Sequence, residues 1–159
     1  MTEQIDTVYR RAYHTAVNLL AVRDHSSVEL TRKLRQRYAD LTTSDLERVF
    51  AELERSGYLS NERFAQSYAR SLVNRGQGPV KILYGLREKG IPDQLAKAAL
   101  TQVEEDEAID WSQLAADLRA RKFGEPLPNN FKERARQSRF LAGRGFNLDS
   151  INAVFHEKC

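Results

Sequence analysis

The apolar positions between residues 78 and 103 follow the spacing of two short helices joined by a tight turn. Pro79 suits the first turn of a helix, because the N–H that it lacks would have no partner there. Gly90 suits the end of that helix, because it adopts the left-handed conformation without strain. The apolar positions assigned to the first helix are Val80, Ile82, Leu83 and Leu86. Those assigned to the second are Leu95, Ala98, Ala99 and Val103.

A similar pattern recurs in the segment 141–155 and, more weakly, in the segment 28–50. The first recurrence pairs Leu86, Lys89, Gly90 and Ile91 with Leu141, Arg144, Gly145 and Phe146. The second places Val28, Leu30 and Leu34 ahead of Val80, Ile82 and Leu86 by 52 residues. Short helices also share motifs by chance, but three copies at a spacing of about 50 residues favour an array of similar helical units.

The remaining segments also have helical periodicity, and none alternates with a period of two. Capping boxes are predicted where Ser26 precedes Glu29 and where Asp110 precedes Gln113. Tyr58 and Leu59 are expected to form an apolar latch into the next unit. We therefore predict an all-α protein of nine helices in three groups. The predicted boundaries are 1–59 for the first three-helix repeat, 60–108 for the second and 109–159 for the third.

The net charge is only +3 at pH 7, but its distribution is uneven. Residues 1–59 carry no net charge, whereas residues 60–103 and 111–159 each carry +4. The intervening stretch 104–110 carries five acidic residues. Two basic bodies separated by an acidic segment indicate either a polyanionic or acidic partner or ordinary solvated helix faces.

No apolar run approaches the ~20 residues needed to span a bilayer, and the first residues have no signal-peptide core. The one cysteine is Cys159, so no internal disulfide and no cysteine cluster for a metal are expected. These features favour a soluble, cytoplasmic protein.

The sequence gives little support to an enzyme. His14, His25 and His156 are scattered, and no set of ligands has the close spacing of a zinc site. Gly76 and Gly78 lack the lysine and the further glycines of a phosphate-binding loop. We therefore expect no catalytic residue, cofactor or metal.

Binding to a partner is better supported, because basic residues recur on the second helix of each proposed unit or on its closing turn. The three clusters are Arg32, Lys33, Arg35 and Arg37; Lys81, Arg87 and Lys89; and Lys132, Arg134, Arg136, Arg139 and Arg144. Such a repeated element suits a charged, periodic partner such as a nucleoprotein filament or nucleic acid. Alternatively, these are the charged outer faces of amphipathic helices, since Glu29, Glu88 and Glu133 dilute each cluster.

Five segments, in order along the chain, resemble the RecX family of bacterial regulators. They are LLAVRDHSSVELTRKL at 19–34, GYLSNERFAQSYARS at 57–71, GPVKILYGLREKGI at 78–91, RKFGEPLP at 121–128 and RFLAGRGF at 139–146. The resemblance implies tandem three-helix repeats that form an elongated, curved array. It also implies a partner, the RecA recombinase assembled on single-stranded DNA. Family members bind the helical groove of that filament and restrain its ATPase, strand-exchange and coprotease activities.

The middle unit departs from the family pattern. Gly85 stands where glutamate is usual, and Gln77 stands where an aromatic residue is common. The leading hypothesis is a monomeric, non-enzymatic negative regulator of RecA. The alternative is a helical DNA-binding protein that acts without RecA, since the segment 78–100 also resembles a helix–turn–helix. An inert scaffold would show neither activity.

Overall fold

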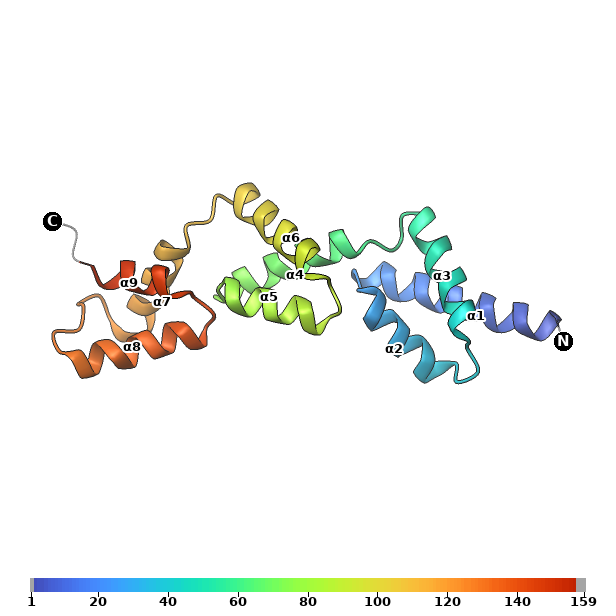
Figure 1. Ribbon diagram of the computed structural model, residues 1–159, viewed down its shortest axis with the longest axis horizontal. Helices are drawn as coiled ribbons and strands as arrows, with labels where there is room; N and C mark the ends of the chain where they lie inside the picture. Colours follow the sequence, from blue (N-terminus) through green and yellow to red (C-terminus); the bar gives the residue numbers. More distant parts are fainter. Residues whose placement is uncertain (1, 157–159) are drawn as a thin grey trace.

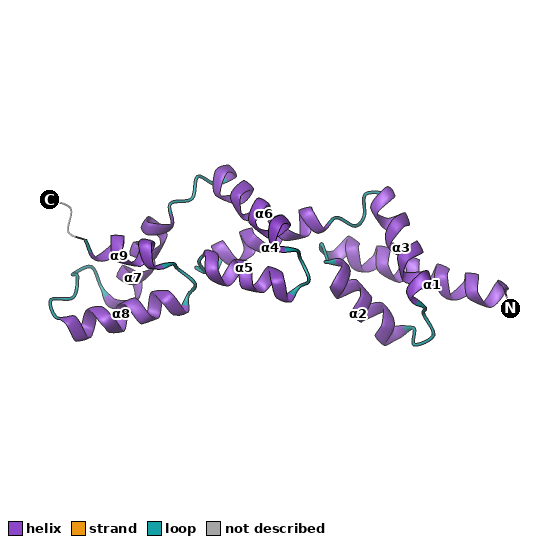
Figure 2. Ribbon diagram, viewed as in Figure 1, coloured by secondary structure: helices purple, strands orange, loops and turns teal. Residues whose placement is uncertain are grey.

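The computed structural model describes residues 2–156, with side chains described from residue 7 onward. This part of the chain contains nine helices and no strand (Figures 1 and 2). The helices are α1 Thr2–Val22, α2 Ser27–Arg37, α3 Thr43–Arg55, α4 Asn61–Asn74, α5 Pro79–Glu88, α6 Asp93–Asp106, α7 Trp111–Phe123, α8 Phe131–Gly143 and α9 Leu148–Phe155. The all-α prediction is therefore confirmed. None of these helices is both long and apolar enough to cross a membrane.

Short polar side chains fix where most of the helices begin. Ser26, for example, accepts a hydrogen bond from the backbone N–H of Glu29, and the Glu29 carboxylate accepts one from the N–H of Ser26. The box predicted at Asp110 is only half formed, because the Gln113 side chain donates to Asp117 instead. Other caps of this kind are Thr42, Ser60, Asn130 and Asn147.

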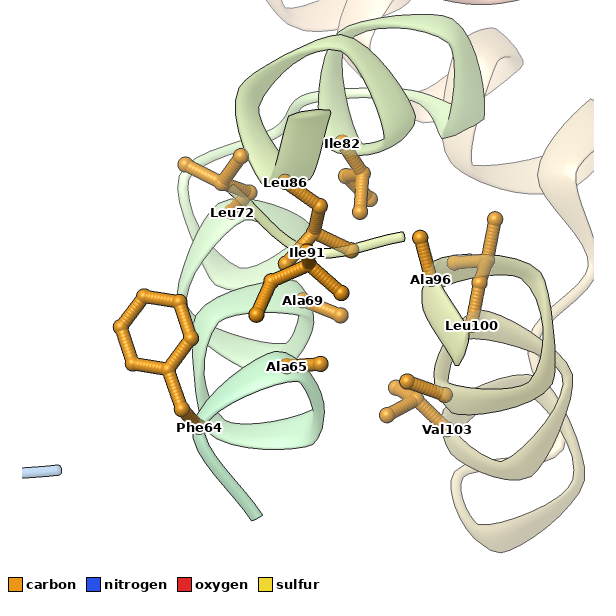
Figure 3. Close-up of a cluster of buried hydrophobic side chains, with 11 residues drawn as sticks. Phe64, Ala65, Ala69, Leu72, Ile82, Leu86, Ile91, Ala96, Leu100 and Val103 are labelled. Atoms are coloured by element: carbon orange, nitrogen blue, oxygen red, sulfur yellow. The ribbon is translucent and has the colours of Figure 1, made fainter. Parts of the chain in front are cut away.

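The helices form three groups, each with its own hydrophobic core. Helix α1 packs on α2 and α3, α4 packs on α5 and α6, and α7 packs on α8 and α9. The middle core is built by Phe64, Ala65, Ala69, Leu72, Ile82, Leu86, Ile91, Ala96, Ala99, Leu100 and Val103 (Figure 3). Three cores in three-helix groups are what the recurring pattern predicts; the residue boundaries proposed above stay a prediction.

Four apolar residues lie elsewhere than the sequence suggested. Leu59 is buried in the first core, and Tyr58 is 47% exposed, so the pair is no latch into the second group. Val80, placed on the apolar stripe of α5, is 56% exposed, and Ala98, placed on that of α6, is exposed as well. The Schellman-type turn at Gly57 explains the first difference, because the N–H groups of both Tyr58 and Leu59 bond back to the Leu53 carbonyl.

The three groups form an elongated row with the two ends of the chain at opposite ends (Figure 1). The second helix of each group, α2, α5 or α8, lies along the lower side of this view. Helices α3 and α6 lie along the upper side. The row therefore presents the second helices, which carry the predicted basic clusters, along one side.

A first joint links the first group to the second through side chains. Asn61 accepts a hydrogen bond from the N–H of Ser27 at 3.1 Å and donates one to its hydroxyl at 3.3 Å. The Arg63 guanidinium pairs with Asp24 at 2.8 Å. These contacts tie the start of α4 to the turn between α1 and α2.

A second joint links the second group to the third through the backbone. The N–H of Gly78 donates to the Arg144 carbonyl at 2.8 Å, and that of Val80 donates to the Gly145 carbonyl at 2.9 Å. A Cβ atom on Gly78 would lie 2.6 Å from the carbonyl carbon of Gly145, so only glycine permits this approach. Trp111 packs against both neighbouring cores and so lies beside this joint.

Ala108, in the turn after α6, has a φ of 49°, which a Cβ atom disfavours. We expect Ala108→Gly to raise the free energy of unfolding by about 0.5 to 1 kcal/mol, because glycine relieves this strain. The matched control is Ala98→Gly, at an exposed position inside α6, which should lower it by about 1 kcal/mol. Chemical denaturation measures both, and a change of the same sign in the two variants would contradict the account.

Candidate partner-binding surface

Three of the four basic residues predicted on α2 point to solvent. Arg32, Arg35 and Arg37 are exposed, and none of them makes an ion pair within the described residues. The Arg35 guanidinium donates a hydrogen bond to the Thr43 hydroxyl at 3.1 Å. These three guanidinium groups are therefore available to a partner.

Lys33, the fourth, is half-buried and bonds internally. Its ammonium lies 2.9 Å from Nε2 of the buried His25, and Nδ1 of His25 lies 3.0 Å from the Arg23 carbonyl. Because an ammonium only donates and a carbonyl only accepts, His25 is neutral with its proton on Nδ1. Burial is the main cause that lowers the pKa of His25, and the charges of Arg23 and Lys33 lower it further. The hydrogen bond to the Arg23 carbonyl and the charge of Glu29 raise the pKa, but they do not outweigh the lowering effects.

This arrangement predicts a pH-dependent stability. The unfolded chain binds a proton at His25 more readily than the folded one, so the stabilisation is complete above pH 6.5 and declines below it. We expect the free energy of unfolding to fall between pH 7 and 5, with a slope of at most about 1.4 kcal/mol per pH unit from this group. His25→Gln should flatten the slope and His14→Gln, at an exposed histidine, should not. An unchanged slope in His25→Gln would contradict the assignment.

The basic residues of α5 and its closing turn are less available. Lys81 is exposed and makes no ion pair within the described part of the chain. Arg87 donates two hydrogen bonds of 3.2 Å to the carboxylate of Asp93 across the turn. Lys89 is half-buried and lies 3.9 Å from Glu29 of the first group. Only Lys81 of this cluster is therefore free, although the exposed Tyr84 adds a large side chain to the same helix.

The third cluster, on α8 and its closing turn, is the most extensive. Arg136 pairs with Glu133, and its hydrogen bond is the main cause of the lowered pKa of that carboxyl group. Arg134 lies over the ring of Phe155 at 5.3 Å, and Arg144 over that of Phe140 at 5.6 Å. The remaining members, Lys132 and Arg139, are exposed. Apart from Arg136, none of the five makes an ion pair within residues 7–156.

One cation that the sequence argument omitted belongs to the third cluster. Lys122, at the end of α7, lies over the ring of Phe140 at 4.9 Å, and Arg136 lies over that of Phe123 at 5.1 Å. The two rings themselves meet edge to face at 5.4 Å. The sequence could have indicated Lys122 as a member of this cluster, because it stands directly before Phe123 in the RKFGEPLP segment that resembles the family.

A cleft of about 500 Å³ opens at the first joint. Glu29, 4% exposed, accepts a 2.8 Å hydrogen bond from Arg23 on its wall. Burial would raise the pKa of Glu29, but the Arg23 bond and the charges of Arg23 and Lys89 outweigh it and lower the pKa. The cleft is lined by Arg23, Asp24, Glu29, Phe64, Ser67, Tyr68, Ser71, Leu72, Arg75 and Lys89. The cleft is therefore lined largely by charged and polar side chains. Neither here nor elsewhere in the described residues do three or more His, Cys, Asp or Glu side chains form a group that could hold a metal ion.

Tyr68 explains why α5 contains a glycine. A Cβ atom on Gly85 would lie 2.0 Å from the Tyr68 hydroxyl oxygen, so the phenol occupies the space that a larger residue would need. Glycine inside a helix costs about 1 kcal/mol relative to alanine. Packing of the Tyr68 ring against the middle core offsets this cost. Gly85 therefore does not interrupt α5, which runs unbroken from Pro79 to Glu88.

The sequence matches protein-family models of the three RecX three-helix domains, one in each group of helices. The first domain matches residues 12–43, the second 60–100 and the third 110–155. The regulatory protein RecX of Salmonella typhimurium is 39% identical over 155 aligned residues, covering 92% of this chain and 91% of that protein. The chain belongs to the RecX family. The RecX protein of Salmonella heidelberg has the same identity and coverage.

Solved RecX structures share the fold. The crystal structure of RecX from Lactobacillus salivarius superposes with a TM-score of 0.78 at 22% identity, covering 94% of this chain and 95% of that one. A second RecX crystal structure gives 0.74 at 22% identity, covering 92% and 72%. The tandem three-helix fold is thus confirmed, and the RecX family consists of regulatory proteins, which are generally not enzymes.

Proposed function

We propose that this protein binds along the helical groove of a RecA filament on single-stranded DNA and lowers the ATPase, strand-exchange and coprotease activities of RecA. One observation carries the proposal. The second helix of each group presents at least one exposed cation without an ion pair among the described residues, and these helices follow one side of an elongated row. A monomer in the bacterial cytoplasm would meet the filament as a chain of linked, individually weak contacts, whose linkage raises avidity.

The cations that this proposal assigns to the contact fall into two classes. The exposed ones without an ion pair in the described residues are Arg32, Arg35, Arg37, Lys81, Arg134 and Arg139, with Arg144 half-buried over Phe140; of these, Arg35 donates one hydrogen bond to the Thr43 hydroxyl and Arg134 lies over Phe155. The internally bonded ones are Lys33, Arg87, Lys89 and Arg136. We expect the first class to contribute more, because the second class must give up an ion pair, or in Lys33 a half-buried hydrogen bond, in exchange for an external partner.

Independent DNA binding through a helix–turn–helix is less favoured by the charges. The candidate recognition helix, α6, carries Asp93, Glu104, Glu105 and Asp106 against the single cation Lys97. Phosphates would repel such a helix. A salt titration with single- and double-stranded DNA in the absence of RecA tests this alternative, since a phosphate-driven complex weakens steeply with salt.

The test of the proposal is the RecA ATPase on single-stranded DNA, measured over a range of concentrations of this protein. Replacing Arg37, Lys81 and Arg139 together with glutamine removes one exposed charge from each second helix. We expect the half-inhibitory concentration to rise by about tenfold or more, because linked contacts multiply. Lys97→Gln is the control, because Lys97 is an exposed cation of α6, the helix that lies along the upper side of the row, and it should change the half-inhibitory concentration by less than about twofold. No inhibition by the wild type at a stoichiometric excess would refute the proposal.

A further inference from the structure

One large apolar side chain in the loop between α7 and α8, residues 124–130, and another at the start of α8 are exposed to solvent. Leu127 is 37% exposed, and Phe131, the first residue of α8, is 86% exposed. Large apolar side chains in such positions give up the stabilisation that burial would provide. Neither the helix caps nor the core of the third group uses these two residues.

A buried arginine holds this loop in place. Arg119 of α7 is only 3% exposed, yet it makes no ion pair within the described residues. Its guanidinium donates to the Glu125 carbonyl at 3.0 Å, to the Pro126 carbonyl at 3.5 Å and to Oε1 of Gln137 at 3.2 Å. The arginine therefore directs its donors to the loop backbone and to α8, and Leu127 follows directly after the carbonyls that it holds.

The backbone on either side of Leu127 is restricted as well. Pro126 and Pro128 each fix a φ angle, which lowers the number of conformations open to the loop. Asn130 then caps α8 by accepting a hydrogen bond from the N–H of Glu133 at 2.8 Å, which fixes Phe131 as the first helical residue. Two exposed apolar side chains on a rigid support lose little conformational freedom when they bind, as binding anchors should.

We propose that Leu127 and Phe131 form an apolar docking tip that inserts into an apolar hollow on a RecA protomer. This inference rests on the proposed function and names the kind of contact that the third group makes. Lys132 and Arg134 flank the tip on α8, where Glu133 is paired with Arg136. The exposed acid beside the tip is Glu125, so the charge next to the tip is on balance positive. The complementary surface therefore has an apolar floor with acidic residues around it, which a protein offers and a phosphate backbone does not.

The experiment compares the tip variant Leu127→Ser/Phe131→Ser with the wild type for binding to RecA filaments on single-stranded DNA. We expect the dissociation constant to rise by about tenfold. The rise should be similar at about 50 and 200 mM salt, because an apolar contact is not screened. Arg134→Gln/Arg139→Gln should instead weaken binding mainly at the lower salt. Leu148→Ser, another exposed apolar residue of the third group, is the matched control and should have little effect.

Each other outcome counts against the tip. If the tip variant binds filaments as the wild type does, or loses affinity only at low salt, the proposal is wrong while groove binding can still hold. If the variant instead loses binding to single-stranded DNA without RecA, the tip is a wedge between bases. If the wild type itself does not bind filaments, the proposed function and the tip fail together. Circular dichroism of each variant confirms that these surface substitutions leave the helices folded.

Discussion

Gly78→Ala should open the joint between the second and third groups and destabilise the protein by about 1 to 3 kcal/mol, the usual cost of overpacking. The added Cβ would lie within 2.7 Å of three backbone atoms of Gly145 and Phe146, which cannot move aside as a side chain can. The φ of Gly78 is −94°, so alanine would not strain the backbone of Gly78 itself. The effect therefore reports mainly the joint, together with the smaller cost of alanine at the N-cap of α5, where glycine is preferred.

Gly143→Ala is the matched control, because nothing lies within 4 Å of a Cβ at that position. It should be neutral or stabilise the protein by up to about 1 kcal/mol, as alanine does in a helix. Fluorescence of Trp111, the only tryptophan, reports the environment beside the joint, and small-angle scattering reports the length of the row. Equal behaviour of the two alanine variants in both measurements would show that the backbone contact at Gly145 does not position the third group.

Glu29→Gln should be the second most destabilising substitution and should lower the free energy of unfolding by about 1 to 2 kcal/mol. Glutamine keeps a hydrogen-bond acceptor for the N–H of Ser26 but removes the counter-charge of Arg23 and Lys89. Losing one member of a fully buried pair costs about 3 to 5 kcal/mol. The expected loss is smaller here because the side chains of Arg23 and Lys89 are 51% and 37% exposed and keep part of their hydration.

Asp45→Asn provides the comparison, since Asp45 closes the same kind of capping box on α3 without an ion pair in the described residues. It should cost less than about 1 kcal/mol. The lowered pKa of Glu29 adds a pH signature: its stabilisation is complete above pH 4.5 and is lost as the pH falls through the lower folded value. The difference in the free energy of unfolding between wild type and Glu29→Gln, measured by denaturation, should therefore become smaller at acidic pH. A difference that stays constant down to pH 3 would contradict the charge argument.

Local structure was predictable because its signals lie close together in the sequence. Ser26 and Glu29 are three residues apart and form the capping box that their spacing predicts. Gly90 and Gly145 end their helices in the left-handed conformation, with φ of 80° and 97°. The recurring apolar spacing was sufficient to predict three groups of helices. The left-handed glycine follows α5 and α8 but not α2, which is why the first copy of the pattern is the weakest.

The joints were not predictable, because they pair residues that no local pattern connects. Nothing in the sequence around Gly78 indicates that the backbone of Gly145 lies against it. Lys33 could not be separated from its exposed neighbours either, since its internal bond depends on where the turn places His25. The space that Gly85 leaves for the Tyr68 hydroxyl was not predictable either, because it depends on how α4 packs against α5. Three-dimensional contacts thus decide which of the predicted cations are free for a partner.

The most direct test of the account is amide hydrogen exchange of this protein, free and bound to RecA filaments on single-stranded DNA. The account predicts added protection over α2, α5 and α8, together with the loop 124–130, and little change over α3 and α6 on the other side of the row. Protection centred on α3 and α6, or confined to one group of helices, would contradict the claim that the three basic helices together face the filament.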